Sequence, residues 1–194
     1  MENIQQPVQH PGRRKAVRGV LEWVETIVTA FVLVAVVFTF LVRIITVDGS
    51  SMNPTYYDQD RVLVSAFAGN VEQGDVVIIV NTLSRPIIKR VIAVEGQVVD
   101  FDPDLREVTV NGIPVQGSVF GIADGITTVP NLPGIVLEFP QRVPEGCVFV
   151  LGDNRGNSTD SRFAEVGMVD ERNILGKVIF NVYPFGKFGP VKTP

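Results

Sequence analysis

The apolar positions divide the chain into one long uninterrupted run and a series of short alternating ones. Residues 26–42 include no charged side chain, and Ile44 and Ile45 extend the apolar character past Arg43. A run of this length reaches the lower limit for crossing the hydrocarbon core of a bilayer. Its valine and phenylalanine surface has no polar face to turn toward water, unlike a core helix of a soluble protein. We therefore predict a transmembrane anchor over residues 20–45.

The flanks of this run predict its orientation. Residues 1–19 form a basic tail that contains Arg13, Arg14, Lys15 and Arg18. Such a cluster is typical of the cytoplasmic side, and Trp23 lies where an interfacial aromatic would anchor the helix. A cleavable secretory signal would have a shorter apolar core followed by a small-x-small site, which residues 43–47 do not offer. We expect a single-pass plasma-membrane protein with a cytoplasmic N-terminus and an extracytoplasmic remainder.

The remainder of the chain has the pattern of a mainly β protein. Short β-branched runs alternate with turn residues, and no long 3.6-residue periodicity occurs. The candidate strands are residues 61–65, 75–80, 87–94, 97–101, 147–151 and 177–183. A hairpin is predicted over residues 107–115, because Asn111-Gly112 accepts the positive φ angles of a type I′ turn.

Turn residues also suggest how the β region is divided. Glycine and proline are frequent between residues 100 and 145, which predicts a second β lobe inserted into a core formed by residues 46–99 and 146–185. Residues 186–194 are expected to be a C-terminal tail. A chain of 194 residues suits one ordinary domain with such an insertion.

Composition excludes several classes of function. The chain after residue 19 carries a net charge of −7, which argues against a nucleic-acid partner. Its lone histidine is His10 and its lone cysteine is Cys147, so no zinc-type cluster can form. The carboxylates near residues 153–162 are interleaved with arginines, which would repel Mg²⁺. We expect no cofactor, no metal and a monomeric protein.

A serine in a tight turn is the first candidate for chemistry. Ser51 lies in Gly49-Ser50-Ser51-Met52-Asn53-Pro54, where a turn would expose its hydroxyl beside a backbone N–H. A serine nucleophile needs a neighbouring base, which is usually histidine. Because His10 precedes the predicted anchor, the base must be another residue. By itself, the segment is more typical of a turn in which Ser50 and Ser51 hydrogen-bond the backbone.

A lysine inside an apolar strand is the second candidate. Strand alternation places Lys89 and Arg90 on opposite faces, so one of them is expected to point inward. Burial disfavours the ammonium form and lowers the pKa of a lysine, and the neutral amine is a general base. Arginine cannot lose its proton in a protein, so the base role falls to Lys89. The pattern leaves open which residue faces inward, or whether both are edge charges facing water.

The third candidate is a dense polar loop over residues 151–162, entered from an apolar strand. Asp153 and Asp160 could pair with nearby arginines, and a small hydroxyl such as that of Ser158 could orient an uncharged lysine amine. Loops this polar are usually shaped by their own hydrogen bonds.

These segments, in this order behind an N-terminal anchor, resemble bacterial type I signal peptidase in its short single-span form. The matching motifs are Ser51-Met52-Asn53-Pro54-Thr55, Gly74 to Val77, Lys89-Arg90-Val91 and Gly152 to Arg162. The resemblance implies an all-β catalytic core of the signal-peptidase type. It also implies a membrane-bound serine endopeptidase that removes signal peptides after Ala-x-Ala-like sites through an acyl-enzyme.

The resemblance also assigns roles to residues. Ser51 is implied as nucleophile, Lys89 as general base and Ser158 as the hydroxyl that positions the lysine amine. Support is implied from Asp153 paired with Arg90 and from Asp160 paired with Arg162. The implied substrate-binding residues are Val47, Met52, Ile87 and Ile88. Some relatives have a serine two residues before the nucleophile, and here that residue is Gly49, so oxyanion stabilisation is expected from the backbone N–H of Ser51.

The implied partners are the signal peptides of exported preproteins and membrane lipid. Four aromatic residues could contact lipid, but they are at least as typical of ordinary core or scattered surface positions: Tyr56, Tyr57, Phe185 and Phe188. Two other classes of function fit part of the pattern. A self-cleaving Ser–Lys repressor-type protease shares the chemistry but is soluble and carries its own cleavage site. A membrane-tethered, non-catalytic β binding domain would not react with an acylating serine-protease inhibitor.

Overall fold

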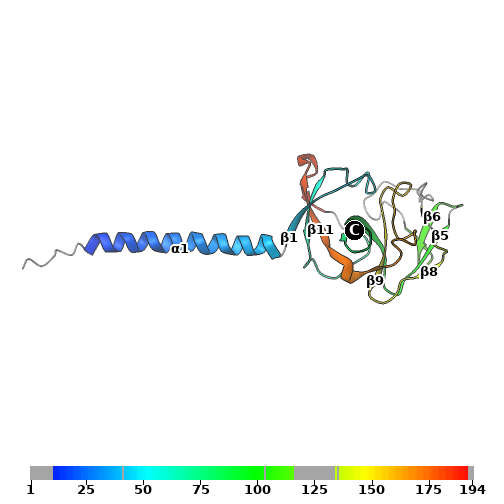
Figure 1. The fold of residues 1–194 in the computed structure, drawn as a ribbon, viewed down its shortest axis with the longest axis horizontal. Coiled ribbons are helices and arrows are strands. Elements are labelled where there is room, and N and C mark those ends of the chain that lie inside the picture. The colour runs from blue at the N-terminus through cyan, green and yellow to red at the C-terminus, as the bar shows by residue number, and fades with distance from the viewer. Residues whose placement is uncertain (1–10, 41, 103, 116–133, 135, 192–194) are drawn as a thin grey trace, which may run out of the picture. The chain divides into compact units, whose positions relative to one another are not determined.

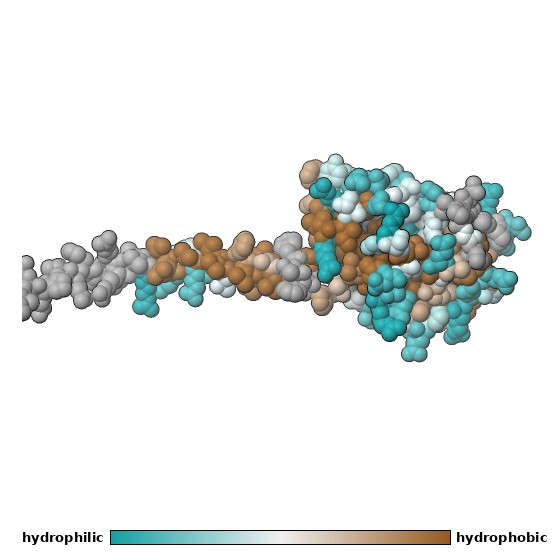
Figure 2. All heavy atoms as spheres, viewed as in Figure 1, coloured by the Kyte–Doolittle hydropathy of each residue, from teal (hydrophilic) through white to brown (hydrophobic). Residues whose placement is uncertain are grey.

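The computed structural model describes residues 11–40, 42–102, 104–115, 134 and 136–191, and the chain forms two compact units, residues 1–41 and 42–194. The first unit contains helix α1 (Pro11–Phe40). Within it, Arg18–Val36 has a mean hydropathy of 1.9 and no buried residue, so it is long and apolar enough to cross a membrane. Figure 2 shows the apolar surface along this helix.

The anchor predicted over residues 20–45 differs from the helix at both ends. Helix α1 begins within the expected basic tail and ends at Phe40, while Val42–Thr46 form strand β1. Strand β1 pairs with β2 (Arg61–Ser65) from Val42↔Ser65 to Thr46↔Arg61. The reason is that Arg43 interrupts the apolar run, and the β-branched residues after it suit a strand once a partner edge is available.

The second unit is built on an eight-stranded antiparallel sheet (Figure 1). Its order is β1-β2-β11-β3-β4-β9-β10, and β12 also pairs with β11. The further strands are β3 (Val76–Ile79), β4 (Ile87–Val94), β9 (Cys147–Leu151), β10 (Val169–Asp170), β11 (Ile174–Tyr183) and β12 (Gly189–Pro190). A 3₁₀ turn, η2 (Glu171–Asn173), leads from β10 into β11.

A second, four-stranded sheet lies at the opposite end of this unit from β1 (Figure 1). Its order is β7-β6-β5-β8, formed by β5 (Val98–Asp102), β6 (Glu107–Val110), β7 (Ile113–Pro114) and β8 (Gln141–Arg142). The predicted hairpin turn has φ angles of 53° at Asn111 and 76° at Gly112, the signs that a type I′ turn requires. Within the expected lobe, residues 100–145, residues 103, 116–133 and 135 lie outside the described residues.

The predicted fold class, mainly β with an N-terminal apolar helix and a second β lobe, is confirmed. Three candidate strands, residues 61–65, 87–94 and 147–151, coincide with β2, β4 and β9. These runs are rich in β-branched residues and bounded by turns, so local preference and tertiary pairing agree.

The C-terminal residues are not a simple tail. After β11 the chain forms a 3₁₀ turn, η3 (Phe185–Lys187), and then β12, which pairs with β11 through Phe180↔Pro190 and Asn181↔Gly189. The Phe188 ring meets the Phe180 ring edge-on with centroids 4.9 Å apart. The expectation of a tail from residue 186 is therefore wrong through Val191, because aromatic packing and strand pairing fold the segment back.

Candidate active site

Ser51 lies in an excursion between β1 and β2 that we call the serine loop, residues 48–59. Two hydrogen bonds close its base, from Val47 N to Asp60 O at 2.8 Å and from Gln59 N to Val47 O at 2.9 Å. Inside the loop, Tyr56 N donates to Met52 O at 2.9 Å. Met52 and Tyr56 are buried in the core while Ser51 stays partly exposed. The loop is thus fixed by its apolar members and presents the serine at the surface.

Strand β4 brings Lys89 to this serine. The Lys89 Nζ donates to Ser51 Oγ at 2.9 Å and to Ile88 O at 2.9 Å. The side chain is only 3% exposed, and this burial lowers the pKa of Lys89 from 10.5 to about 8, although Asp160 and Asp153 partly oppose the shift. A substantial fraction of the amine is therefore neutral near pH 8.

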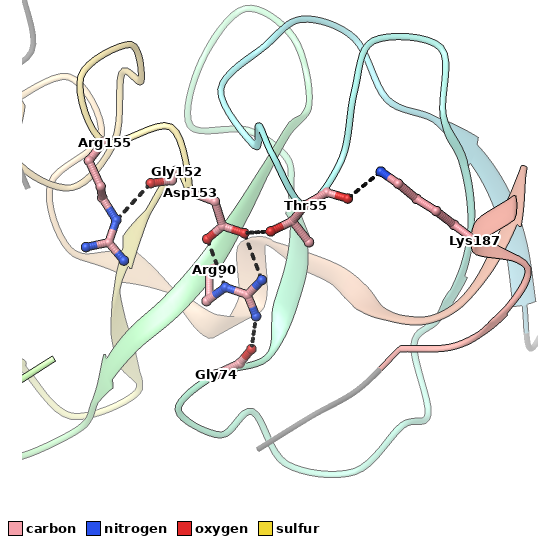
Figure 3. Close-up of polar contacts among 7 residues, drawn as sticks. All are labelled: Thr55, Gly74, Arg90, Gly152, Asp153, Arg155 and Lys187. Atoms are coloured by element: carbon pink, nitrogen blue, oxygen red, sulfur yellow. Dashed lines mark hydrogen bonds and ion pairs between the residues drawn. The ribbon is translucent and has the colours of Figure 1, made fainter. Parts of the chain in front are cut away.

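The neighbouring Arg90 is buried as well, at 2% exposure. Its Nε donates to Asp153 Oδ1 at 2.9 Å, its Nη2 to Asp153 Oδ2 at 2.7 Å and its Nη1 to Gly74 O at 2.8 Å (Figure 3). The expectation that one of the two cations points inward is therefore wrong. Both are buried, because Asp153 compensates the charge of Arg90 while Lys89 can shed its own.

The polar loop after β9, residues 152–162, holds a second buried ion pair. Arg162 Nε and Nη2 each donate to an Asp160 oxygen at 2.8 Å, and Gly152 N donates to Asp160 Oδ2 at 3.0 Å. Arg155 Nε donates to Gly152 O at 3.1 Å. The pairs Asp153–Arg90 and Asp160–Arg162 implied by the resemblance are thus present as contacts.

Several hydrogen bonds join the polar loop to the serine loop. Asn154 N donates to Ser51 O and Asn154 Nδ2 to Ser50 O, both at 3.0 Å. Asn157 Nδ2 donates to Ser50 Oγ at 3.0 Å, and Thr55 Oγ1 donates to Asp153 Oδ2 at 2.6 Å. Sequence reasoning missed Thr55, Asn154 and Asn157 as site residues. The signal that could have identified them is the high number of amide and hydroxyl side chains in the motifs of residues 51–55 and 152–162.

Ser158 and Gly152 lie close to the serine but are used differently from expectation. Ser158 is 1% exposed, and its Oγ has no hydrogen-bond partner among the described residues. The hydrogen bonds of Lys89 Nζ go to Ser51 and Ile88 instead. A Cβ placed on Gly152 would overlap the Ser158 hydroxyl and lie 2.5 Å from Ser51 O. Gly152 therefore lets the polar loop approach the serine closely, and the positioning role of Ser158 stays a prediction.

An apolar cavity of about 220 Å³ opens next to Ile88, the residue that precedes Lys89 on β4. Its lining residues are Ile45, Thr46, Val47, Asp48, Ile78, Arg85, Pro86, Ile87 and Ile88. Of the predicted substrate-binding residues, Val47, Ile87 and Ile88 are therefore gathered at one cavity. Met52 does not line it, because its side chain is fully buried in the adjoining core cluster.

The aromatic residues that could contact lipid separate into two groups. Tyr57, Phe185 and Phe188 are exposed. Tyr56 is 2% exposed and belongs to the core cluster, so the core position is correct for this residue and lipid contact is not. Burial raises the pKa of Tyr56 to about 12, which keeps its hydroxyl protonated at physiological pH.

A hydroxyl hydrogen-bonded to a desolvated lysine amine is the arrangement that a lysine-assisted serine hydrolase requires, so this is the candidate active site. Among the described residues, no group of three or more His, Cys, Asp or Glu side chains could hold a metal ion.

Comparison with known proteins identifies the family. The family model described as signal peptidase, peptidase S26, matches residues 20–183. Signal peptidase IB of Staphylococcus aureus (strain COL) is 35% identical over 182 residues, covering 88% of this chain and 93% of the relative. Signal peptidase I S of Bacillus subtilis (strain 168) is 32% identical over 174 residues, covering 88% and 92%. The chain belongs to the signal peptidase family S26, and it is a serine peptidase that removes signal peptides.

Among solved structures, a signal peptidase I from Enterococcus faecalis V583 is similar, with 24% sequence identity and a TM-score of 0.41. The match covers 57% of this chain and 97% of that one.

Proposed function

We propose that Ser51 is the nucleophile and Lys89 the general base of this peptidase. The observation that carries the proposal is the 2.9 Å contact between Lys89 Nζ and Ser51 Oγ, made by an amine that is almost fully buried. The neutral amine takes the hydroxyl proton while Ser51 Oγ bonds to the carbonyl carbon of the scissile peptide. The C–N bond then breaks, and the leaving amine takes the proton back from Lys89.

The second half of the reaction uses the same groups. Lys89, again neutral, takes a proton from water as the water oxygen attacks the acyl-enzyme, and the proton returns to Ser51 Oγ when the ester bond breaks. The N–H of Ser51 donates no hydrogen bond to any described residue, so it is available to the oxyanion of each tetrahedral intermediate. Gly49 at φ 92° carries no hydroxyl that could add a second donor.

We propose that the substrate binds as an added strand beside Ile87 and Ile88. Strand β3 pairs with Ile87–Arg90 on one side, and the pairing of β4 with β9 begins only at Arg90. The opposite edge of residues 87–89 therefore carries no strand among the described residues, and an extended peptide could pair there. The adjoining cavity of about 220 Å³ would accept small side chains near the scissile bond.

The proposed cellular setting follows from the N-terminal unit. The basic residues before the apolar stretch favour a cytoplasmic N-terminus, so the β-rich unit would work on the outer side of the plasma membrane as part of a single-pass protein. Exposed Tyr57, Phe185 and Phe188 are suited to lipid contact. The acidic β-rich unit argues against a nucleic-acid partner, and we propose a monomer.

The test is cleavage of a model preprotein by the full-length protein in detergent micelles. Ser51→Ala and Lys89→Met should each abolish cleavage while the circular dichroism and thermal midpoint remain close to those of the parent. An acylating serine-protease inhibitor should modify the parent but not Ser51→Ala. Turnover retained by both variants would refute the dyad. Cleavage of the enzyme's own chain in place of the preprotein would favour the self-cleaving alternative.

A further inference from the structure

The C-terminal turn reaches the serine loop through one side chain, that of Lys187 at the end of η3. Lys187 Nζ donates to Thr55 O at 2.9 Å (Figure 3). The same ammonium lies 3.4 Å from Asp60 Oδ2 and 4.5 Å from the centroid of the Tyr57 ring. Three residues of one short segment, Thr55, Tyr57 and Asp60, therefore share a single cation that comes from far along the chain.

The anchorage of Lys187 is firm. Its backbone N donates to Pro184 O at 2.9 Å, which closes the η3 turn. The following Phe188 packs edge-on against Phe180 of β11, and β12 then pairs with the same strand. The Lys187 ammonium therefore comes from a turn that is fixed to the main sheet. Its long side chain connects this turn to the serine loop.

Thr55 is the residue through which Lys187 contacts the candidate site. Its carbonyl accepts from Lys187, while its hydroxyl donates to Asp153, the partner of buried Arg90 (Figure 3). Arg90 is adjacent to Lys89 on β4, and Thr55 is four residues after Ser51. One residue of the serine loop is therefore held from two sides, by the C-terminal turn and by the ion pair next to the lysine strand.

We propose that Lys187 is a positioning residue for the reaction, holding the serine loop so that Ser51 Oγ stays within hydrogen-bond distance of Lys89 Nζ. Removing the ammonium would free Thr55 O and leave the Asp60 carboxylate with only its hydrogen bond from Tyr57 N among the described residues. The segment could then shift, and a misplacement of about 1 Å at reacting groups can cost up to about a hundredfold in rate. This inference rests on the proposed roles of Ser51 and Lys89.

The chain offers a matched control in Lys177. Its Nζ donates to Asn70 O at 2.8 Å and lies 2.9 Å from Asp75 Oδ2, so it also joins one carbonyl and one largely buried carboxylate to β11. Its contacts end on the segment before β3 and not on the serine loop. Both substitutions therefore remove one carbonyl contact and one carboxylate contact, while Lys187→Met also removes the contact with the Tyr57 ring, and only Lys187→Met removes contacts with the serine loop.

The experiment measures kcat and KM for a model preprotein, the rate of Ser51 acylation by a serine-protease inhibitor, and the thermal midpoint. Lys187→Met should lower kcat and the acylation rate by roughly tenfold with KM within about twofold, because positioning acts on the chemical step. Lys187→Arg, which keeps the charge and the donors, should recover most of the rate. Lys177→Met should shift the midpoint at most and leave kcat unchanged.

Two results would overturn the inference. The first is parental kcat and acylation rate in Lys187→Met. The second is an equal loss of kcat in Lys177→Met, which would show a general effect of stability. If Lys187→Met does not fold, Lys187→Gln is measured against the same criteria. Ser51→Ala is assayed alongside: its activity would refute the dyad itself, whereas an inactive Ser51→Ala beside a fully active Lys187→Met would refute only the role of Lys187.

Discussion

The two sheets of the β-rich unit differ in whether they bury charged side chains. In the four-stranded sheet, the buried side chains on β5 and β6 are apolar: Val99, Phe101, Val108 and Val110. In the eight-stranded sheet and its loops, Lys89, Arg90, Asp153, Asp160 and Arg162 are all buried. Burying a charge costs free energy unless a partner compensates it. The four-stranded sheet is therefore stabilised by burial of apolar side chains. The eight-stranded sheet buries charged side chains at a cost in free energy, and these side chains fix the geometry of the candidate site.

The largest effect on stability is expected when one partner of a buried ion pair is removed, and this substitution tests the difference between the two sheets. Asp153→Ala should leave Arg90 uncompensated and release Thr55, which we expect to cost about 3–5 kcal/mol of unfolding free energy. Preprotein cleavage should fall with it. Denaturant unfolding measures the first effect, and a change below 1 kcal/mol would contradict the reading of this pair as tightly coupled.

The matching change in the other sheet should separate stability from chemistry. Phe101→Ala removes a ring that meets Phe139 edge-on with centroids 5.9 Å apart, and we expect a loss of about 3 kcal/mol. The kcat per folded molecule, normalised by titrating reactive serine, should stay at the parental value. A tenfold fall in this normalised kcat would show that the second sheet also serves the site.

The pH dependence of cleavage sharpens the contrast between the neighbours Lys89 and Arg90. Only the neutral amine accepts the Ser51 proton, so the rate should rise as pH increases through about 8, the lowered pKa of Lys89, and then level off. Only Lys89 of the two can act as the base, because a guanidinium group cannot lose its proton in a protein. A rate of preprotein cleavage that is flat from about pH 6 to 10 would contradict the assignment of Lys89 as base.

The smallest effect is expected at the surface. Asp48 and Arg85 form a 2.6 Å ion pair at the cavity, but both side chains are about 70% exposed. Arg85→Ala should therefore change unfolding free energy by less than about 1 kcal/mol, and the change should shrink further in high salt. Equilibrium unfolding at two salt concentrations tests this, and a loss comparable to that of Asp153→Ala would remove the distinction between buried and exposed pairs.

The sequence predicted best what local pattern controls. Strands β2, β4 and β9 are short β-branched runs between turns, and their limits could be read directly. A long apolar helix was predicted in the right part of the chain, but the helix begins earlier and ends sooner than expected, because pairing with β2 draws residues 42–46 into the sheet. The fold of residues 186–191 was missed for a similar reason, since it depends on packing against β11.

Within the site, the residue types were easier to predict than their contacts. Ser51 and Lys89 could be proposed from their local setting, whereas the specific pairs Asp153–Arg90 and Asp160–Arg162 came from the resemblance to type I signal peptidase. Thr55 and Lys187 were missed because their contacts join segments about a hundred residues apart, and nothing in either segment points to the other. That Lys89 and Arg90 are both buried also required the position of Asp153.

The proposed substrate edge of β4, residues 87–89, has no strand on its second side among the described residues, and this has a consequence for how secreted proteins can evolve. Hydrogen bonds to a substrate backbone do not depend on its side chains, so under the proposed binding mode most of a leader sequence is free to drift. Only the few side chains that would enter the cavity of about 220 Å³ are then constrained. One processing enzyme can therefore serve a large and changing secretome without changing with it.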